Sequence, residues 1–93
     1  MKVIKRSGNI VDYAEDKIAK SIRNTATDME ELISDRDAAL IASDVTKHMK
    51  ELRGDDFLTS TYEVRMITAM AMKDFGFGEI AKRYLENGFR NVK

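Results

Sequence analysis

The chain has 93 residues, with 16 basic and 16 acidic side chains and no cysteine. This length fits one domain with one modest core. Balanced charge gives no overall field to attract nucleic acid or an anionic membrane, and the lack of cysteine excludes disulfides and thiolate sites. No apolar run reaches the ~18 residues of a membrane span, and residues 1–6 lack the apolar core of a signal peptide, so we expect a cytoplasmic protein.

Residues 2–6 and 9–13 are short β-branched stretches on either side of a Ser7-Gly8-Asn9 turn. Glycine and asparagine both tolerate positive φ, so this pattern predicts a β-hairpin. Because two strands alone are marginally stable in water, we expect the hairpin to lie on an apolar surface.

Two helices are predicted next. Asp12 and Glu15 have the spacing of a capping arrangement for the first helix. The second is expected over residues 35–53, opened by Ser34 and closed by Gly54. Apolar residues at helical spacing indicate the inward face of each helix. These are Ile18, Ile22, Ala26 and Met29 in the first helix, and Ala38, Ile41, Val45, His48 or Met49, and Leu52 in the second.

The sequence Ser60-Thr61-Tyr62-Glu63 is a capping box that predicts a third helix ending near Gly76, and a fourth is expected over residues 78–90. Residues 56–59 are a candidate third strand beside the hairpin. The expected fold is therefore α+β and mainly α, a four-helix bundle capped by a small antiparallel hairpin or three-stranded sheet, with residues 1–93 as one domain. The expected inward residues are Val64, Ile67, Met70 or Ala71, Ile80, Ala81, Tyr84 and Leu85.

Three cations are expected near the hairpin turn. Lys5 and Arg6 stand at the end of the first strand, and Lys17 lies in the first turns of the next helix. A helix N-terminus adds unpaired N–H groups and the positive end of the helix dipole, so this arrangement is suited to a polyphosphate. On spacing alone, a solvated basic edge strand is the competing interpretation.

The order of these motifs resembles the ATP-cone domain family over essentially the whole chain. The opening Lys5-Arg6-x-Gly8, the aromatic Tyr13 and the pair Lys17-Ile18 are similar to the family's turn and first helix. The later similarities lie at the start of the third helix and in the last helix. They are Ser60 or Thr61 with Glu63-Val64, and Ala81-x-x-Tyr84 followed by Phe89-Arg90.

This resemblance implies an allosteric domain that binds ATP or dATP, with or without Mg²⁺, and that has no catalytic residues of its own. Such domains are known at the N-terminus of ribonucleotide reductases and in a bacterial repressor of reductase genes, so a reductase catalytic domain or subunit is an expected partner. Nucleotide contacts are implied for Val3, Lys5, Arg6 and Lys17, and with less support for Thr59. Val3 and Ile18 flank the cations and are expected to contact the purine.

Some residues favour other interpretations. Ala14 stands where many family members have Asp or Asn, which favours a helical protein-interaction module that has lost nucleotide binding. Met66, Met70 and Met72 are interpreted as core filling, with a partner-binding face as the alternative. A patch that also includes Tyr84 and Phe89 would support weak self-association modulated by nucleotide. His48, the only histidine, is expected to be an ordinary helix residue.

Overall fold

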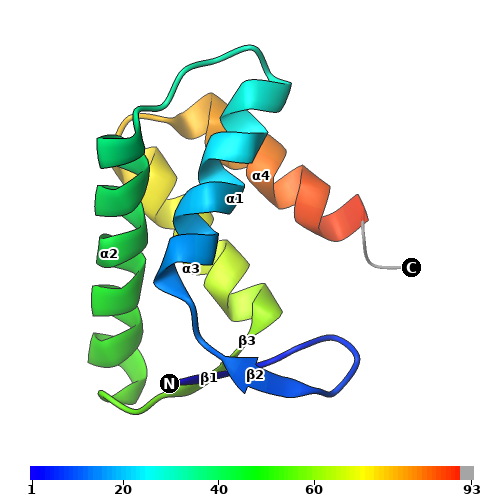
Figure 1. The fold of residues 1–93 in the computed structure, drawn as a ribbon, viewed down its shortest axis with the longest axis vertical. Coiled ribbons are helices and arrows are strands. Elements are labelled where there is room, and N and C mark those ends of the chain that lie inside the picture. Colours follow the sequence, from blue (N-terminus) through cyan, green and yellow to red (C-terminus); the bar gives the residue numbers. More distant parts are fainter. Residues whose placement is uncertain (91–93) are drawn as a thin grey trace.

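The computed structural model describes residues 1–90 and contains four helices. They are α1 (Glu15–Asp28), α2 (Asp35–Arg53), α3 (Thr61–Asp74) and α4 (Gly78–Arg90). Figure 1 shows α1 and α2 as an antiparallel pair, with α3 and α4 behind them and a small sheet at one end of the bundle. The α+β, mainly α architecture predicted from the sequence is confirmed.

Three short strands form the sheet, β1 (Lys2–Ile4), β2 (Ile10–Asp12) and β3 (Leu58–Ser60), in the order β2-β1-β3. β1 and β2 make the expected antiparallel hairpin, and its turn places Gly8 at φ +91°. The third strand is also confirmed, but it runs parallel to β1, so the expectation of an antiparallel sheet is wrong there. The reason is the route of the chain. α1 leads away from the end of β2 and α2 leads back, so β3 begins at the same end of the sheet as β1 and runs in the same direction.

Helix boundaries follow local capping chemistry. The Asp37 N–H donates to Ser34 Oγ at 3.0 Å, and Gly54 at φ +92° ends α2, so the predicted range 35–53 is confirmed. The predicted Asp12 cap of α1 is wrong. Asp12 belongs to β2 and accepts a hydrogen bond from Lys2, and the N-cap position is Ala14, which makes no side-chain cap.

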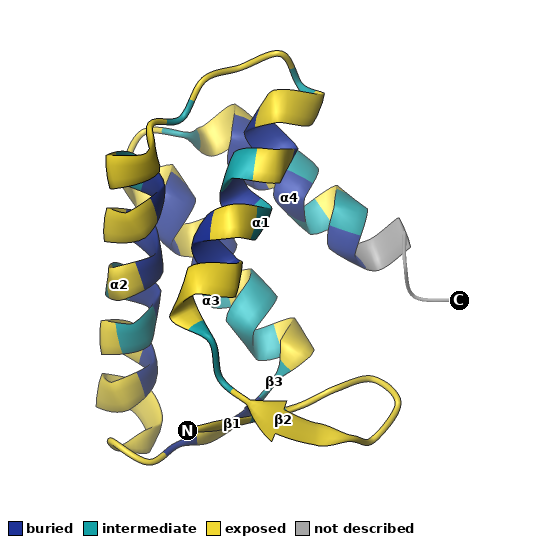
Figure 2. Cartoon of the chain, viewed as in Figure 1, coloured by how far each residue is buried: buried dark blue, intermediate teal, exposed yellow. Residues whose placement is uncertain are grey.

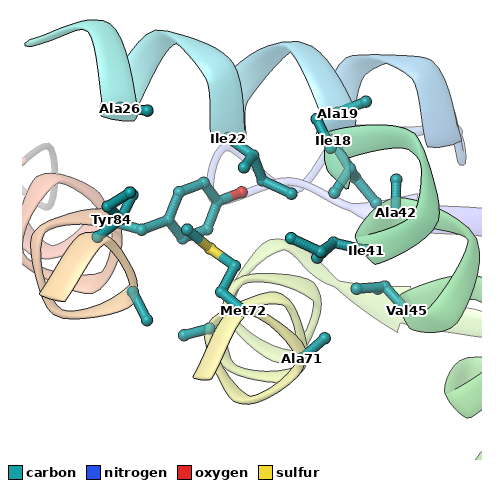
Figure 3. Packing of buried hydrophobic residues seen from close by; sticks show 14 residues of the cluster. Ile18, Ala19, Ile22, Ala26, Ile41, Ala42, Val45, Ala71, Met72 and Tyr84 are labelled. Carbon is teal, nitrogen blue, oxygen red and sulfur yellow. The ribbon is translucent and has the colours of Figure 1, made fainter. Parts of the chain in front are cut away.

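The core lies between the four helices (Figures 2 and 3). Phe57, directly before β3, is also buried. Leu52, predicted to face inward, is instead 62% exposed, and of the alternatives Met70 and Ala71 it is Ala71 that is buried, while Met70 is 63% exposed. Leu52 lies in the last turn of α2, and Met70 is on the outer face of α3, where its neighbour Ala71 takes the inward place. The apolar residues without exposed surface are Ile22, Ala38, Ile41, Val45, Met49 and Met72.

Candidate functional site

A cavity of about 160 Å³ lies where the hairpin meets the N-terminal turns of α1 and α3, with one ring from α4. We call it the hairpin cavity. Its apolar wall comes from both hairpin strands and from all of the neighbouring helices, so no single segment of the chain forms it. The apolar and aromatic residues of the wall are Val3, Val11, Tyr13, Ala14, Ile18, Val64 and Tyr84.

Three cations line the hairpin cavity: Lys5, Lys17 and Arg65. Across residues 1–90, neither lysine forms an ion pair with a carboxylate. The Arg65 guanidinium donates to the Tyr84 carbonyl oxygen at 3.0 Å and lies over the Tyr84 ring at 4.6 Å from its centroid. Because these charges converge on one partly apolar space, the cavity is suited to an anion that carries an apolar group.

Asp12 brings a negative charge to the same cavity, but that charge is already paired. The Lys2 ammonium donates to its carboxylate across the β1–β2 pair. This hydrogen bond, with the attraction of the two charges, lowers the pKa of Asp12 and raises the pKa of Lys2. The Lys2 charge therefore offsets that of Asp12, and the remaining lining charge is positive.

Four of the six residues predicted to bind nucleotide meet in this cavity: Val3, Lys5, Lys17 and Ile18. Arg6 lines a second, smaller cavity of about 70 Å³ beside it. The two cavities share Thr61 and Arg65, so the Arg6 cavity adjoins the first through these two side chains.

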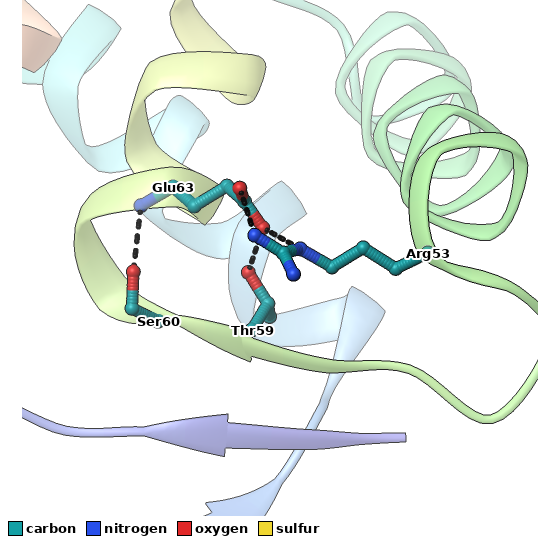
Figure 4. Close-up of polar contacts among 4 residues, drawn as sticks. All are labelled: Arg53, Thr59, Ser60 and Glu63. Atoms are coloured by element: carbon teal, nitrogen blue, oxygen red, sulfur yellow. Dashed lines mark hydrogen bonds and ion pairs between the residues drawn. The ribbon is translucent and has the colours of Figure 1, made fainter.

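Thr59, the sixth predicted residue, is not among the residues that line either cavity. It belongs to β3, it is buried, and its hydroxyl donates to Glu63 Oε1 at 2.6 Å. The Glu63 carboxylate also accepts two hydrogen bonds from the Arg53 guanidinium, at 2.5 and 2.8 Å (Figure 4). The backbone N–H of Glu63 donates to Ser60 Oγ. These contacts join β3, α2 and α3, so we assign Thr59 to the framework of the site.

Sequence reasoning missed Arg65, and it assigned Tyr84 to the core and to a candidate association patch but not to the nucleotide site. Both line the hairpin cavity, and Tyr84 is also buried, with its hydroxyl hydrogen-bonded to Ser21 Oγ at 2.9 Å. One signal was available for Arg65, because it lies four residues after Thr61 and so shares its face of α3, and both residues line the cavity.

Tyr13 fixes the segment between β2 and α1. Its ring meets Phe57 edge-on at a centroid distance of 4.9 Å, and its hydroxyl shares a 2.9 Å hydrogen bond with Thr46. Burial raises the pKa of the Tyr13 hydroxyl above its ordinary value. Thr46 also donates to Glu15 Oε1 at 2.6 Å, so the first turn of α1 is tied to α2 although Ala14 gives no side-chain cap. This network holds Lys17 and Ile18 at the cavity.

His48 is not among the residues that line the hairpin cavity. His48 is half-exposed, with Nε2 at 3.3 Å from Asp44 on the same helix, as expected of an ordinary helix residue. Within residues 1–90, no group of three or more His, Asp or Glu side chains is placed to hold a metal ion. None of the helices described is both long and apolar enough to span a bilayer.

Of the methionines interpreted as core filling, Met72 is buried, whereas Met66 and Met70 are exposed. Tyr84, expected in an exposed patch with them, is only 4% exposed, so that part of the patch is wrong. The Phe89 side chain and the Phe89-Arg90 pair lie outside the described side chains.

Comparison with curated proteins gave no match. A family model described as the ATP cone domain matches residues 1–87, which is essentially the whole chain. The match includes every residue of the hairpin cavity, from Val3 to Tyr84. ATP-cone domains are in general nucleotide-binding regulatory domains, and this chain belongs to the ATP-cone family.

Proposed function

We propose that the hairpin cavity binds an adenine nucleotide, ATP or dATP, and that the chain is a regulatory module and not an enzyme. The observation that carries this proposal is that two lysines and an apolar wall line the same cavity. Lys5 and Lys17 have no carboxylate partner in the described chain, and the wall contains Val3 and Ile18. A purine with a polyphosphate has both of the matching surfaces.

The phosphates are assigned to the cationic side of the cavity. Lys5 and Lys17 supply compact charges, and Arg65 supplies a planar fork that suits phosphate oxygens. Arg6 extends this surface, because its cavity adjoins the first through Arg65. The N-terminus of α1 adds its dipole, and Ala14 presents no side chain that would compete with a ligand for the first N–H groups.

The purine is assigned to the apolar side, between Val3 on β1 and Ile18 on α1. Val3 is half-buried and Ile18 is buried, so both have fixed positions before a ligand arrives. A preformed apolar wall lowers the ordering cost of binding. Base contacts of this kind favour ATP over inorganic triphosphate.

The hairpin cavity offers Mg²⁺ no unpaired carboxylate among its lining residues. Asp12 is the only carboxylate among its lining residues, and Lys2 already pairs with it. Mg²⁺ prefers oxygen ligands and keeps several of its waters, so an ion that accompanies the nucleotide would be held by the phosphates. We therefore propose that nucleotide binding persists when Mg²⁺ is removed by a chelator.

The signal is assigned to α3 and α4, because Arg65 touches the cavity and α4 at once. The receiving partner that we propose is a ribonucleotide reductase catalytic domain or subunit, in the cytoplasm. An effector shifts such an equilibrium only through differential binding to its two states, so ATP and dATP must favour different arrangements of this surface.

Calorimetric titration with ATP, dATP, ADP and inorganic triphosphate, each with and without Mg²⁺, tests the proposal. We expect saturable binding of the adenine nucleotides that is tighter than binding of triphosphate. Equal affinity for ATP and triphosphate would show that only charge is recognised. No binding of any nucleotide would favour the second candidate, a helical interaction module, which the exposed Met66 and Met70 support.

A further inference from the structure

An apolar groove of about 340 Å³ lies between α3 and α4. We call it the α3–α4 groove. Its rim includes Met66 and Met70, which are both exposed, and its floor is formed by the small residues Ala69 and Ala81 with Leu85. Flexible methionine side chains around a shallow floor are suited to receive one branched apolar side chain.

Two lysines, Lys73 and Lys82, complete the lining of this groove, one from each helix. No carboxylate lines it, and within residues 1–90 neither lysine forms an ion pair. The groove thus combines an apolar floor with positive charge on both sides. Its complement is an apolar side chain accompanied by carboxylates.

The loop between α1 and α2 presents that complement. Leu32 is 95% exposed, and Glu30 and Glu31 directly precede it. Met29 and Ile33, which flank residues 30–32, are partly buried against the core, so this exposed stretch lies between two anchored residues. Figure 2 shows the connection between α1 and α2 as largely exposed. We call residues 30–32 the Leu32 loop.

Backbone contacts at the end of α1 hold the start of this loop in place. Glu30 has φ +59°, and the Glu31 N–H donates to the Ala26 carbonyl oxygen at 2.9 Å, which is the hydrogen bond of a Schellman helix end. The loop therefore projects Leu32 from a fixed base, and little ordering is needed when it meets a partner.

We propose that the Leu32 loop of one copy of this chain binds in the α3–α4 groove of a second copy. Leu32 enters between Met66 and Met70, while Glu30 and Glu31 approach Lys73 and Lys82. No loop residue lines the groove of its own chain, so the contact is between copies. Because loop and groove are different surfaces, a pair of bound copies still has one free loop and one free groove. Further copies can bind at both ends, so the assembly is a head-to-tail series.

Sedimentation velocity on the nucleotide-free chain, over a concentration series up to about 1 mM, tests this proposal; 1 mM corresponds to weak binding. We expect species larger than a dimer to appear as concentration rises. Leu32→Ser should weaken association by about 10- to 100-fold, from the lost burial of one leucine. Leu52→Ser, at an exposed leucine in the last turn of α2, is the matched control and should leave association unchanged.

A charge exchange gives the sharper result. Glu30→Lys/Glu31→Lys and Lys73→Glu/Lys82→Glu should each abolish self-association, because like charges then meet. An equimolar mixture of the two variants should recover it. Three results would overturn the proposal. The first is a wild-type chain that stays monomeric at every concentration, and the second is unchanged association of Leu32→Ser. The third is a mixture that stays monomeric while both charge variants keep wild-type helical circular dichroism. Nucleotide titration of Leu32→Ser should match wild type, so this outcome is separate from that of the hairpin cavity.

Discussion

The Arg65 guanidinium on α3 covers the Tyr84 ring on α4 and donates to the carbonyl oxygen of the same residue. This double contact requires that α4 have no side chain one turn further along. Gly88 provides that space, because a Cβ built there would lie 2.8 Å from Arg65 Cζ and closer still to the side-chain atoms before it.

Gly88→Ala is therefore expected to destabilise the fold, although alanine is normally better by about 0.8–1 kcal/mol inside a helix. The displaced Arg65 loses a cation–π contact of about 0.5–1 kcal/mol and a charged hydrogen bond of about 1.5–3 kcal/mol. We expect a net loss of about 1 kcal/mol in urea unfolding. Gly78→Ala, where the added Cβ meets open space, is the control and should cause no such loss. A stabilised Gly88→Ala variant would contradict this account.

Lys17→Ala should weaken ATP binding by about 1–3 kcal/mol, the range for one charge-assisted hydrogen bond. Calorimetry measures the loss, and Lys5→Ala/Lys17→Ala should lose more. Lys20→Ala, on the same helix but outside the cavity lining, should bind as wild type does. Wild-type affinity in the double variant would remove the phosphate assignment.

The Arg53–Glu63 contact predicts a pH dependence of stability. Hydrogen bonds from Arg53 and Thr59 lower the pKa of Glu63 below its ordinary value of 4.5. A carboxylate with a lowered folded pKa stabilises the protein above its unfolded pKa, and this contribution is lost as pH falls through the folded value. The stability difference between wild type and Glu63→Gln should therefore be largest at pH 7 and shrink below about pH 4.5. A difference that stays constant in thermal unfolding at pH 7, 4.5 and 3 would refute the contribution.

Glu30→Gly should raise the free energy of unfolding by about 0.5–1 kcal/mol, because Glu30 holds a left-handed conformation that glycine adopts without steric cost. The same change at Lys20, which is exposed in the interior of α1, should instead cost about 1 kcal/mol. Thermal unfolding of the two variants separates these effects. Equal destabilisation by both would mean that the Glu30 conformation carries no strain.

Local chemistry was readable from the sequence where a single residue decides a boundary. Ser34, Gly54 and Ser60 stop or start helices through hydrogen bonds to nearby backbone or through positive φ, so the limits of α2 and the start of α3 were predictable. The hairpin pattern and the family resemblance together predicted that four of the cavity residues share one site: Val3, Lys5, Lys17 and Ile18. Their spacing alone also fits a basic edge strand.

The rest depends on contacts between distant segments. The parallel pairing of β1 with β3 is set by the path of two helices, and a strand pattern has no sign of the partner's direction. Arg65 reaches the cavity because Gly88 on another helix leaves room for it, and helical periodicity does not record such a pair. Leu52 and Met70 follow the helical period but are exposed, because the period alone does not tell which positions a neighbouring element covers.

The sheet order β2-β1-β3 has a consequence for folding. Val3 pairs with Thr59, and the hairpin cavity draws on residues from Val3 to Tyr84, so the binding surface is complete only after the most distant segments of the chain have met. Such non-local closure is entropically costly and is completed late. A nucleotide bound there would recognise the finished native state alone and would stabilise it by mass action, by about 2.7 kcal/mol at a concentration of 100 Kd. The effector would then act as a selective stabiliser of the whole fold as well as a signal.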